Sequence, residues 1–257
     1  WDWISMNPNI TMKDILDNPD KPWDWNAISS NPSITMKDIL DNPNVYWDWY
    51  YISKNPSIRK IEKYQIKPLM EAIYNEKNKD KSDLLKLFFL LGQHPYTEIC
   101  QMRWDQIQDD SEYPNTKWWV MEEGFHKVKS LRHTVYLNHV AMKIINRQKG
   151  KHDTYVFTSK SNLDKEGNRL PYTKSSFTKQ MKRIKEHIGT QDIDIRCFRA
   201  SLTTHLREMG KGYEPSYLLG QALPGISNRV YTRSEFKSQK IEMTNAWTKF
   251  IEDCCKS

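Results

Sequence analysis

Apolar residues recur every three or four positions in several stretches of the chain, with polar and charged residues between them. Such spacing is typical of amphipathic helices whose apolar face packs inward. Ser82 and Asn138 stand at the start of two of these stretches, and both residue types are favoured helix caps. The pattern predicts helices over residues 82–91, 97–106, 138–148 and 174–188, and one more, followed by a polar linker, over residues 64–79.

Apolar and polar residues alternate in two neighbouring stretches, which is the period of a strand with one buried face. Residues 117–123 and 127–137 are therefore predicted to form a β-hairpin, and residues 155–159 a short strand. A basic loop is predicted over residues 160–172. The expected fold class is mainly α with a small antiparallel β-sheet, an α+β arrangement.

The first 58 residues repeat one pattern, in which Trp-Asp-Trp is followed by Asn-Pro and then by Thr-Met-Lys-Asp-Ile-Leu-Asp-Asn-Pro. We refer to residues 1–22, 23–46 and 47–58 as the first, second and third segments; the third holds only the first part of the pattern. Trp23 and Trp47 mark a 24-residue period, from which the first segment is two residues short. Self-similarity of this kind indicates a repeat array.

The second segment shows how each unit is expected to fold. Thr35 is a predicted cap for a short helix, with Asp38 at the capping-box position. Pro43 disfavours helical backbone at Asn42, so that helix should end there. Each unit then holds two short helical turns, stacked on its neighbour through Trp and Ile side chains. Arrays of this type form scaffolds or binding surfaces.

The chain is predicted to have three parts: tandem helical repeats over residues 1–58, a helix and linker over residues 59–81, and one larger domain over residues 82–257. Two and a half copies are few for an independent repeat array, which leaves room for further copies before Trp1.

Positive charge is concentrated outside the repeats. The chain has 39 Lys and Arg against 32 Asp and Glu, a net charge of +7. Residues 1–57 contain eight Asp, no Glu and four Lys, so they carry −4 and residues 58–257 carry +11. A field of this sign favours phosphate backbones, with binding that weakens as salt rises. Four cations on the helix predicted over residues 174–188 face either DNA or solvent: Lys179, Lys182, Arg183 and Lys185.

Several functional classes are excluded. No apolar run approaches the ~20 residues needed to cross a bilayer, and the amino end lacks a signal-peptide pattern. The cysteines lack zinc-site spacing and suggest no disulfide framework: Cys100, Cys197, Cys254 and Cys255. These features predict an intracellular, reducing setting without a membrane partner, and they indicate neither a metal nor a cofactor.

Residues 195–236 hold side chains suited to chemistry at a phosphodiester. Arg199 lies in a Cys-Phe-Arg-Ala-Ser run that opens a helix, Gln221 ends Leu-Leu-Gly-Gln, and Tyr231 follows ten residues later. An arginine fork can hold two phosphate oxygens. Attack without a metal depends on such positioning and charge stabilisation. A phenol, with a pKa of ~10, needs cationic neighbours to ionise at neutral pH.

From about Leu84 to Phe250, several segments in order resemble the catalytic domain of tyrosine recombinases, the phage-integrase class. The family's first helix, its Gly-x-Arg turn and the helix after that turn are similar to residues 84–107, LLKLFFLLGQHPYTEICQMRWDQI. The family's β-hairpin with the catalytic lysine resembles residues 118–137, WWVMEEGFHKVKSLRHTVYL. Its His-x-x-Arg helix resembles residues 195–206, IRCFRASLTTHL. LLGQ resembles Leu-Gly-His, and VYTRSEF the nucleophile segment. The resemblance implies site-specific cleavage and rejoining of double-stranded DNA, with self-assembly of four protomers on two duplexes.

The resemblance also implies individual roles. Tyr231 is then the nucleophile that forms a 3′-phosphotyrosyl bond, and Arg199 is the second arginine that holds the scissile phosphate. The general acid for the departing 5′-oxygen is either Lys127 or Lys129, because counting from the two sides of the hairpin turn gives different answers.

Three positions depart from the family pattern. His94 stands, in a Gln-His-Pro turn, nearest to the place of the family's first arginine. Arg196 replaces the histidine of His-x-x-Arg, and Gln221 replaces the histidine of Leu-Gly-His. Arg196 can supply charge and Gln221 can donate a hydrogen bond, but neither acts as a proton-transfer base near neutral pH. Loss of one charged donor raises the barrier by about 3 kcal/mol, roughly a hundredfold in rate.

Three functions therefore stay open: an active recombinase, a catalytically impaired DNA-binding relative, and an interaction protein whose repeats are the functional part. The three segments resemble the Trp-Asp-Trp and Asn-Pro tandem repeats of giant DNA viruses. That resemblance implies a viral protein of the host cytoplasm, the nucleus or the virion, with a protein partner for the repeats.

Overall fold

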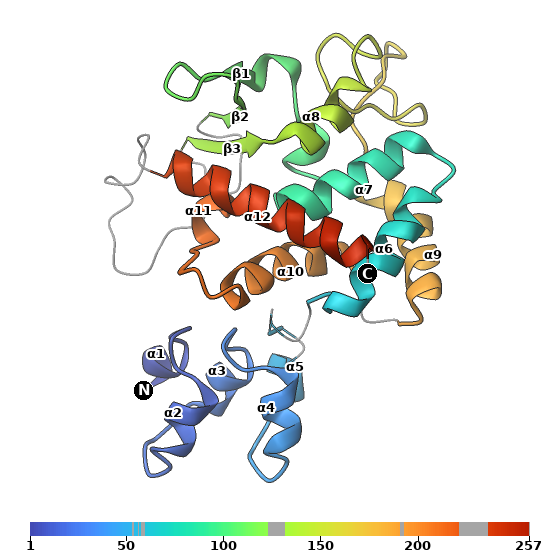
Figure 1. The fold of residues 1–257 in the computed structure, drawn as a ribbon. Helices are drawn as coiled ribbons and strands as arrows, with labels where there is room; N and C mark the ends of the chain where they lie inside the picture. The colour runs from blue at the N-terminus through green and yellow to red at the C-terminus, as the bar shows by residue number, and fades with distance from the viewer. Residues whose placement is uncertain are drawn as a thin grey trace.

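The computed structural model describes residues 1–52, 54, 55, 57, 60–122, 132–190, 193–220 and 236–256. Helices dominate it (Figure 1). The N-terminal part holds α1 (Asp2–Ser5), α2 (Met12–Leu16), α3 (Trp25–Ser29), α4 (Met36–Asp41) and α5 (Trp49–Ile52). The larger part holds α6 (Lys63–Tyr74), α7 (Lys79–Leu91), α8 (His139–Asn146), α9 (Thr178–Ile188), α10 (Ile195–Glu208), α11 (Ser216–Leu219) and α12 (Lys237–Lys256). Among the residues described, no helix is both long and apolar enough to span a membrane.

Three short strands form one antiparallel sheet in the order β1-β2-β3. They are β1 (Ile107–Asp109), β2 (Lys117–Met121) and β3 (His133–Leu137). Trp119 lies opposite Ile107 on one side and Val135 on the other. The predicted fold class, mainly α with a small antiparallel sheet, is confirmed.

The sheet differs in detail from the prediction. The hairpin pairs residues 117–121 with 133–137, and a third strand, β1, was not anticipated because three residues carry too little alternation to be recognised. The strand predicted over residues 155–159 is wrong. Tyr155 makes only an isolated antiparallel bridge, to Arg103, and this bridge does not extend into a strand.

Three single-turn 3₁₀ helices complete the fold: η1 (Ile99–Gln101), η2 (Trp104–Gln106) and η3 (Lys174–Phe177). The first two replace the helix predicted over residues 97–106. The chain is extended at Met102, whose carbonyl accepts a hydrogen bond from Val156 N at 2.9 Å. This tertiary bond takes the place of a helical one. Similarly, the helix predicted over residues 174–188 divides into η3 and α9.

Local caps decide where two other helices begin. Asn138 accepts a hydrogen bond from Ala141 N at 3.0 Å, as predicted. Ser82 does not cap α7. That helix starts one turn earlier, where Asn78 accepts from Lys81 N, and the buried Ser82 hydroxyl instead donates to the Ile73 carbonyl at 2.7 Å.

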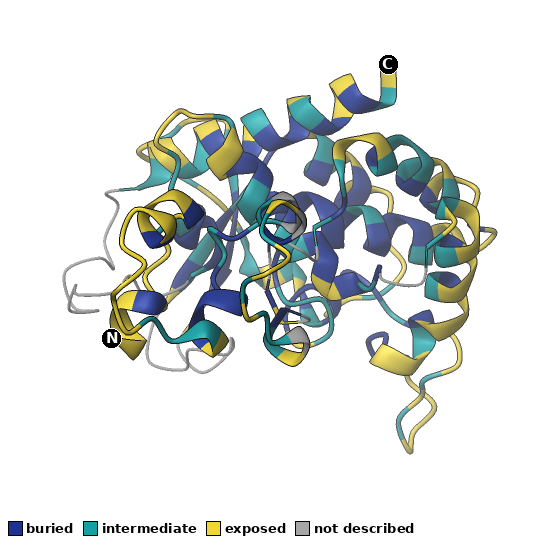
Figure 2. Ribbon diagram, turned by 90° about the horizontal axis from the view of Figure 1, so that it is seen from below, coloured by how far each residue is buried: buried dark blue, intermediate teal, exposed yellow. Residues whose placement is uncertain are grey.

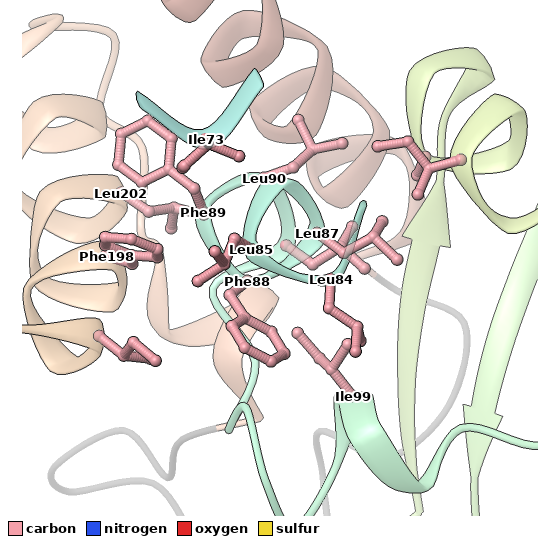
Figure 3. Packing of buried hydrophobic residues seen from close by; sticks show 14 of the residues in the cluster. Ile73, Leu84, Leu85, Leu87, Phe88, Phe89, Leu90, Ile99, Phe198 and Leu202 are labelled. Carbon is pink, nitrogen blue, oxygen red and sulfur yellow. The ribbon is translucent and has the colours of Figure 1, made fainter. Parts of the chain in front are cut away.

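Helix α7 is the centre of the core. Its apolar side chains from Leu84 to Leu91 are buried on almost every side, which is typical of a helix surrounded by others. Figure 3 shows the Phe89 side chain of α7 next to Phe198 and Leu202 of α10. The Phe89 ring lies 5.3 Å from Phe198 of α10 and 5.2 Å from Trp247 of α12, centroid to centroid. Gly92 ends the helix at φ +64°, a left-handed conformation that favours glycine, and a Cβ there would lie 3.0 Å from Leu202 Cδ1.

The N-terminal segments make the same contacts at an offset of 24 residues. Asn31 Nδ2 donates to the carbonyls of Ser5 at 2.8 Å and Asn7 at 3.0 Å. Asn55 Nδ2 donates to the corresponding carbonyls of Ser29 at 3.2 Å and Asn31 at 2.7 Å. The second and third segments are thus each held to the one before by a buried amide.

Tryptophan pairs and capping boxes recur in the same way. Trp1 packs edge-on against Trp23, and Trp25 packs edge-on against Trp47. Trp1 therefore takes the place of Trp25, so the first segment starts at the third position of the pattern and the 24-residue offset holds throughout. The predicted capping box at Thr35 is present. The helix that it starts ends at Asp41.

The chain enters the larger part beside α10. Ile61 N donates to Ser201 Oγ at 2.7 Å, and the Ile61 carbonyl lies 2.8 Å from His205 Nε2. Because a carbonyl only accepts, His205 is the donor. Lys60 forms an ion pair with Glu208, also on α10, at 2.5 Å. Three successive turns of α10 therefore bind the two residues that lead into α6.

Candidate active site

A cavity of about 790 Å³ lies where the turn after α7, the start of α9 and the first turn of α10 meet. Its lining is rich in cations: Lys174, Lys182, Lys185, Arg196 and Arg199. Asp194 is the one acidic residue among the described residues that line it. A wall of this charge favours an anionic ligand.

Arg199, which is partly buried, is one of the residues that line this cavity. Its guanidinium donates to the Gly92 carbonyl at 3.1 Å and to the Leu219 carbonyl at 3.3 Å. These carbonyls belong to the ends of α7 and α11, so one side chain connects three helices. Burial lowers the pKa of Arg199 from its ordinary value, and the nearby Glu98 carboxylate acts in the opposite direction.

Arg196 projects from the first turn of the same helix. Asp194 caps α10 by accepting from Arg196 N at 2.7 Å, and its carboxylate also binds the Arg196 guanidinium at 2.5 Å. Partial burial raises the pKa of Asp194, but the hydrogen bonds from Arg196 outweigh it and hold that pKa below its ordinary value. The charge of Arg196 is therefore partly neutralised by its own cap residue.

His94 lies in the turn that follows Gly92. Its backbone N donates to the buried Glu98 carboxylate at 2.6 Å, and its Nδ1 lies 2.8 Å from Thr97 Oγ1. The preceding residue, Gln93, is buried and donates from Nε2 to the Leu218 carbonyl at 2.7 Å. The turn is thus fixed from both sides, and His94 lines the same cavity as the two arginines.

The cations of α9 are divided between two environments. Lys182 and Lys185 line the cavity, whereas Arg183 forms an ion pair with Glu76 at 3.1 Å on another side of the helix. Lys174, in η3, joins the cavity lining although the sequence did not single it out. The only local signal for it is the capping box at Thr173 directly before η3.

Comparison with known proteins identifies the family. The profile described as "Phage integrase family" matches residues 59–221, which is more than half of the chain. The chain belongs to the phage integrase family. No curated protein sequence matches it.

Solved structures of recombinases share similarity with this integrase-family chain. The XerH site-specific recombinase bound to difH substrate, in a pre-cleavage complex, is 14% identical with a TM-score of 0.49, covering 93% of this chain and 72% of that one. The Tn1549 transposon integrase, residues 82–397, in complex with circular intermediate DNA, is 14% identical with a TM-score of 0.41, covering 91% and 85%.

The residues singled out in the sequence fall into two groups in this integrase-family protein. His94, Arg196 and Arg199 come together around the cavity. The other four lie outside the described residues: Lys127, Lys129, Gln221 and Tyr231. In the part of the chain that the structure describes, no group of three or more His, Cys, Asp or Glu residues is arranged to hold a metal ion.

Two further residues escaped the sequence analysis. Asp194 is the cap of α10, and its position directly before an amphipathic run was a usable signal. His133, at the start of β3, packs against Gly220 at the end of α11: a Cβ on Gly220 would lie 2.9 Å from the His133 ring. That approach is tertiary, and no local pattern indicates it.

Proposed function

We propose that this integrase-family protein binds double-stranded DNA and cleaves and rejoins its strands through a 3′-phosphotyrosyl intermediate at Tyr231. The observation that carries the proposal is the cation-lined cavity to whose lining Arg199 belongs. Arg199 occupies the place that the family's motif gives to the second arginine. A phosphate bound there meets a guanidinium fixed by two helix ends, in a cavity that Lys182 and Lys185 also line.

In the proposed reaction, the Tyr231 hydroxyl releases its proton to solvent, Oη attacks the phosphorus, and the P–O5′ bond breaks. The 3′-phosphate stays on the tyrosine, and the departing 5′-oxygen takes a proton from Lys127 or Lys129. Rejoining reverses these steps with the 5′-hydroxyl of another strand. The cations of the cavity stabilise the extra negative charge on the phosphate oxygens in the transition state.

A catalytically impaired DNA-binding protein is the second candidate, and it rests on His94. Its imidazole ring offers no bidentate fork of the kind that an arginine has. Arg196 is held by Asp194 at 2.5 Å, so its charge does not fully replace a first arginine. We expect slow cleavage for this reason.

The N-terminal segments have a separate role in this proposal. They act as a tandem-repeat module, of the kind that giant DNA viruses carry, ahead of a catalytic domain over residues 82–257. Net charges of −4 for residues 1–57 and +11 for residues 58–257 support this division, since an acidic array is poorly suited to DNA. The protein then works inside the host cell or in the virion and assembles on DNA.

A nicked suicide substrate tests the proposal. The full chain is incubated with a pool of nicked duplexes of random sequence, and covalent adducts are detected on a denaturing gel. We expect a weak adduct that is absent from Tyr231→Phe, while that variant still binds duplex DNA in a salt-sensitive way. Binding without adduct in the unmodified chain would favour the impaired protein. No DNA retention would leave the repeats as the functional part.

A further inference from the structure

The cavity of the candidate site has an apolar wall as well as its cations. Pro95, Tyr96 and Met181 are partly exposed members of its lining, and Phe88 and Phe177, also in the lining, are 1% and 0% exposed. Buried residues of this kind fill the interior of the larger part (Figure 2). A phosphate group binds to cations but gains nothing from an apolar wall. The lining therefore fits a ligand that combines an anionic group with a flat, weakly polar one.

Tyr96 is held in this wall by the two phenylalanines. Its ring lies 6.2 Å from Phe88 and 6.1 Å from Phe177, centroid to centroid. Because both neighbours are fixed in the core, the Tyr96 ring is positioned before a ligand binds. Burial raises the pKa of Tyr96 to about 12, and the Cys100 thiol and the Asp194 carboxylate act in the same direction. The phenol therefore stays neutral and does not repel a phosphate.

One face of α9 brings the apolar wall and the cations together. The residues of α9 that line the cavity are Thr178, Met181, Lys182 and Lys185. They stand at positions i, i+3, i+4 and i+7, which lie on one side of a helix. The thioether of Met181 suits contact with a flat aromatic group, and the ammonium groups of the two lysines suit contact with a phosphate.

A nucleotide has both kinds of group. Cavities that hold small organic ligands measure about 300–1,000 Å³, and this one measures about 790 Å³, so it has room for more than a phosphate. Nucleobases stack on aromatic side chains whatever their sequence, while lysine and arginine bind the backbone. A base inside a duplex is stacked between its neighbours, so it can reach such a cavity only after it leaves the stack.

We propose that the cavity binds one unstacked nucleotide of the DNA, with its base against Tyr96 and Met181 and its phosphate among the cations. The inference rests on the proposed function, because it takes DNA as the ligand. It adds the form of DNA that the site prefers, which is a duplex with one base outside the helix. The base then gives the protein a hold on DNA that does not depend on charge.

Two bulged duplexes of otherwise identical sequence test the inference. One carries a single unpaired adenine, and the other carries an abasic sugar at the same place, so both have the same backbone charge and only the base differs. The full chain with Tyr231→Phe is used, so that cleavage does not interfere, and affinity is measured by fluorescence anisotropy. We expect about tenfold tighter binding of the duplex with the unpaired adenine, which corresponds to one base–aromatic stack.

Substitutions in the wall separate stacking from charge. Tyr96→Ala should remove the preference for the unpaired adenine, whereas Tyr96→Phe keeps the ring and should keep the preference. Lys182→Ala should weaken binding of both duplexes alike, because it removes a phosphate contact. Tyr64→Ala, which changes an exposed tyrosine of α6, is the matched control and should keep the preference.

Met181→Ala is a second variant in case Tyr96→Ala does not fold, which thermal unfolding would show. Met181 is partly exposed on a helix, and alanine is a good helix former, so this variant should fold. It should lower the preference by about threefold, through loss of the thioether contact with the base.

A free nucleotide offers the same chemistry as a nucleotide in DNA, and competition distinguishes the two. Because dAMP carries one phosphate, it should displace the bulged duplex only above about 1 mM. Displacement by dAMP below about 10 μM would assign the cavity to a free nucleotide and overturn the inference. Equal affinity for the two bulged duplexes, or a preference that survives both Tyr96→Ala and Met181→Ala, would also overturn it.

The outcome is distinguishable from that of the proposed function. Equal affinity for the two duplexes together with a covalent adduct on the nicked substrate would reject the unstacked nucleotide alone. A preference for the unpaired adenine without any adduct would support the unstacked nucleotide and reject cleavage at Tyr231.

Discussion

Arg199 Nη1 lies 3.1 Å from the carbonyl oxygen of Gly92 and donates a hydrogen bond to it. This bond joins the helix of the candidate phosphate site to the turn that carries His94. The guanidinium therefore holds parts of the fold together, and Arg199 also lines the cavity. Its two roles predict separable effects on stability and on chemistry.

Arg199→Ala should lower the free energy of unfolding by about 2–3 kcal/mol, because two buried carbonyls lose their donor, and should abolish the DNA adduct. Arg199→Lys keeps the charge but not the fork, so it should recover part of the stability and little of the adduct. Urea unfolding and denaturing gels measure the two effects. Arg207→Ala, which breaks a more exposed ion pair on the same helix, should change stability by about 0.5 kcal/mol or less. An Arg199→Lys protein with unchanged adduct formation would contradict the phosphate role.

His94→Arg should raise the initial rate of adduct formation between about tenfold and a hundredfold, because it supplies a permanent, bidentate charge at the cavity. His94→Ala is the matched control and should not raise the rate. Single-turnover kinetics with the nicked duplex measure both. Equal rates for the two variants would show that this turn does not contact the phosphate.

Asp194→Asn should increase affinity for duplex DNA several-fold at low salt, because it releases Arg196 and removes the acidic group from the cavity lining. Asparagine also caps helices, so stability should change little. Asp194→Ala removes the cap and should cost about 1 kcal/mol. Anisotropy titrations over a range of salt concentrations measure affinity. Unchanged binding in both variants would mean that DNA does not reach this part of the cavity.

Lys240 predicts a pH dependence of stability. Its ammonium donates to the Thr134 carbonyl at 2.8 Å, and burial, assisted by the charge of Lys237, lowers its pKa from 10.5 to about 8. Between these values the unfolded chain holds the proton and the folded chain has released it, so stability rises as pH increases across this window.

Relative to Lys240→Met, the unmodified protein should therefore gain about 2–3 kcal/mol between pH 7 and pH 10.5, at about 1.4 kcal/mol for each pKa unit. Denaturant unfolding of both proteins at several pH values measures the difference. Groups common to both proteins cancel in this comparison. A difference that stays constant with pH would mean that Lys240 remains charged in the fold.

Asn31→Ala should destabilise the N-terminal segments by about 2 kcal/mol, because the carbonyls of Ser5 and Asn7 lose a buried donor. Asn7→Ala changes the same residue type at the corresponding exposed position and should have almost no effect in the isolated chain. Limited proteolysis in increasing urea compares the two. Equal loss of protection would mean that the buried amide does not hold the segments together.

Local signals predicted the elements that depend on neighbouring residues. The caps at Thr35 and Asn138 were recognised because cap and helix lie within one turn. Ser82 was misread because Asn78, one turn earlier, is an equally good cap, while Ser82 satisfies a carbonyl of α6. The segment from Thr97 onward was misread because a hydrogen bond between Met102 and Val156 competes with helix formation.

The candidate site was predictable only in part. Motif order identified Arg199, Arg196 and His94, which the fold brings to one cavity. Lys174 lies in η3, whose Phe177 ring packs against Phe88 of α7, and His133 at the start of β3 lies against Gly220 at the end of α11. Such tertiary contacts depend on long-range packing, which local patterns in a single sequence do not reveal.

The attachment of Ile61 to Ser201 and His205 has a mechanical consequence. The segment that connects the acidic N-terminal segments to α6 is hydrogen-bonded to α10, the helix that carries Arg196 and Arg199. A displacement of the N-terminal segments would therefore act directly on this helix and on the two arginines that it carries.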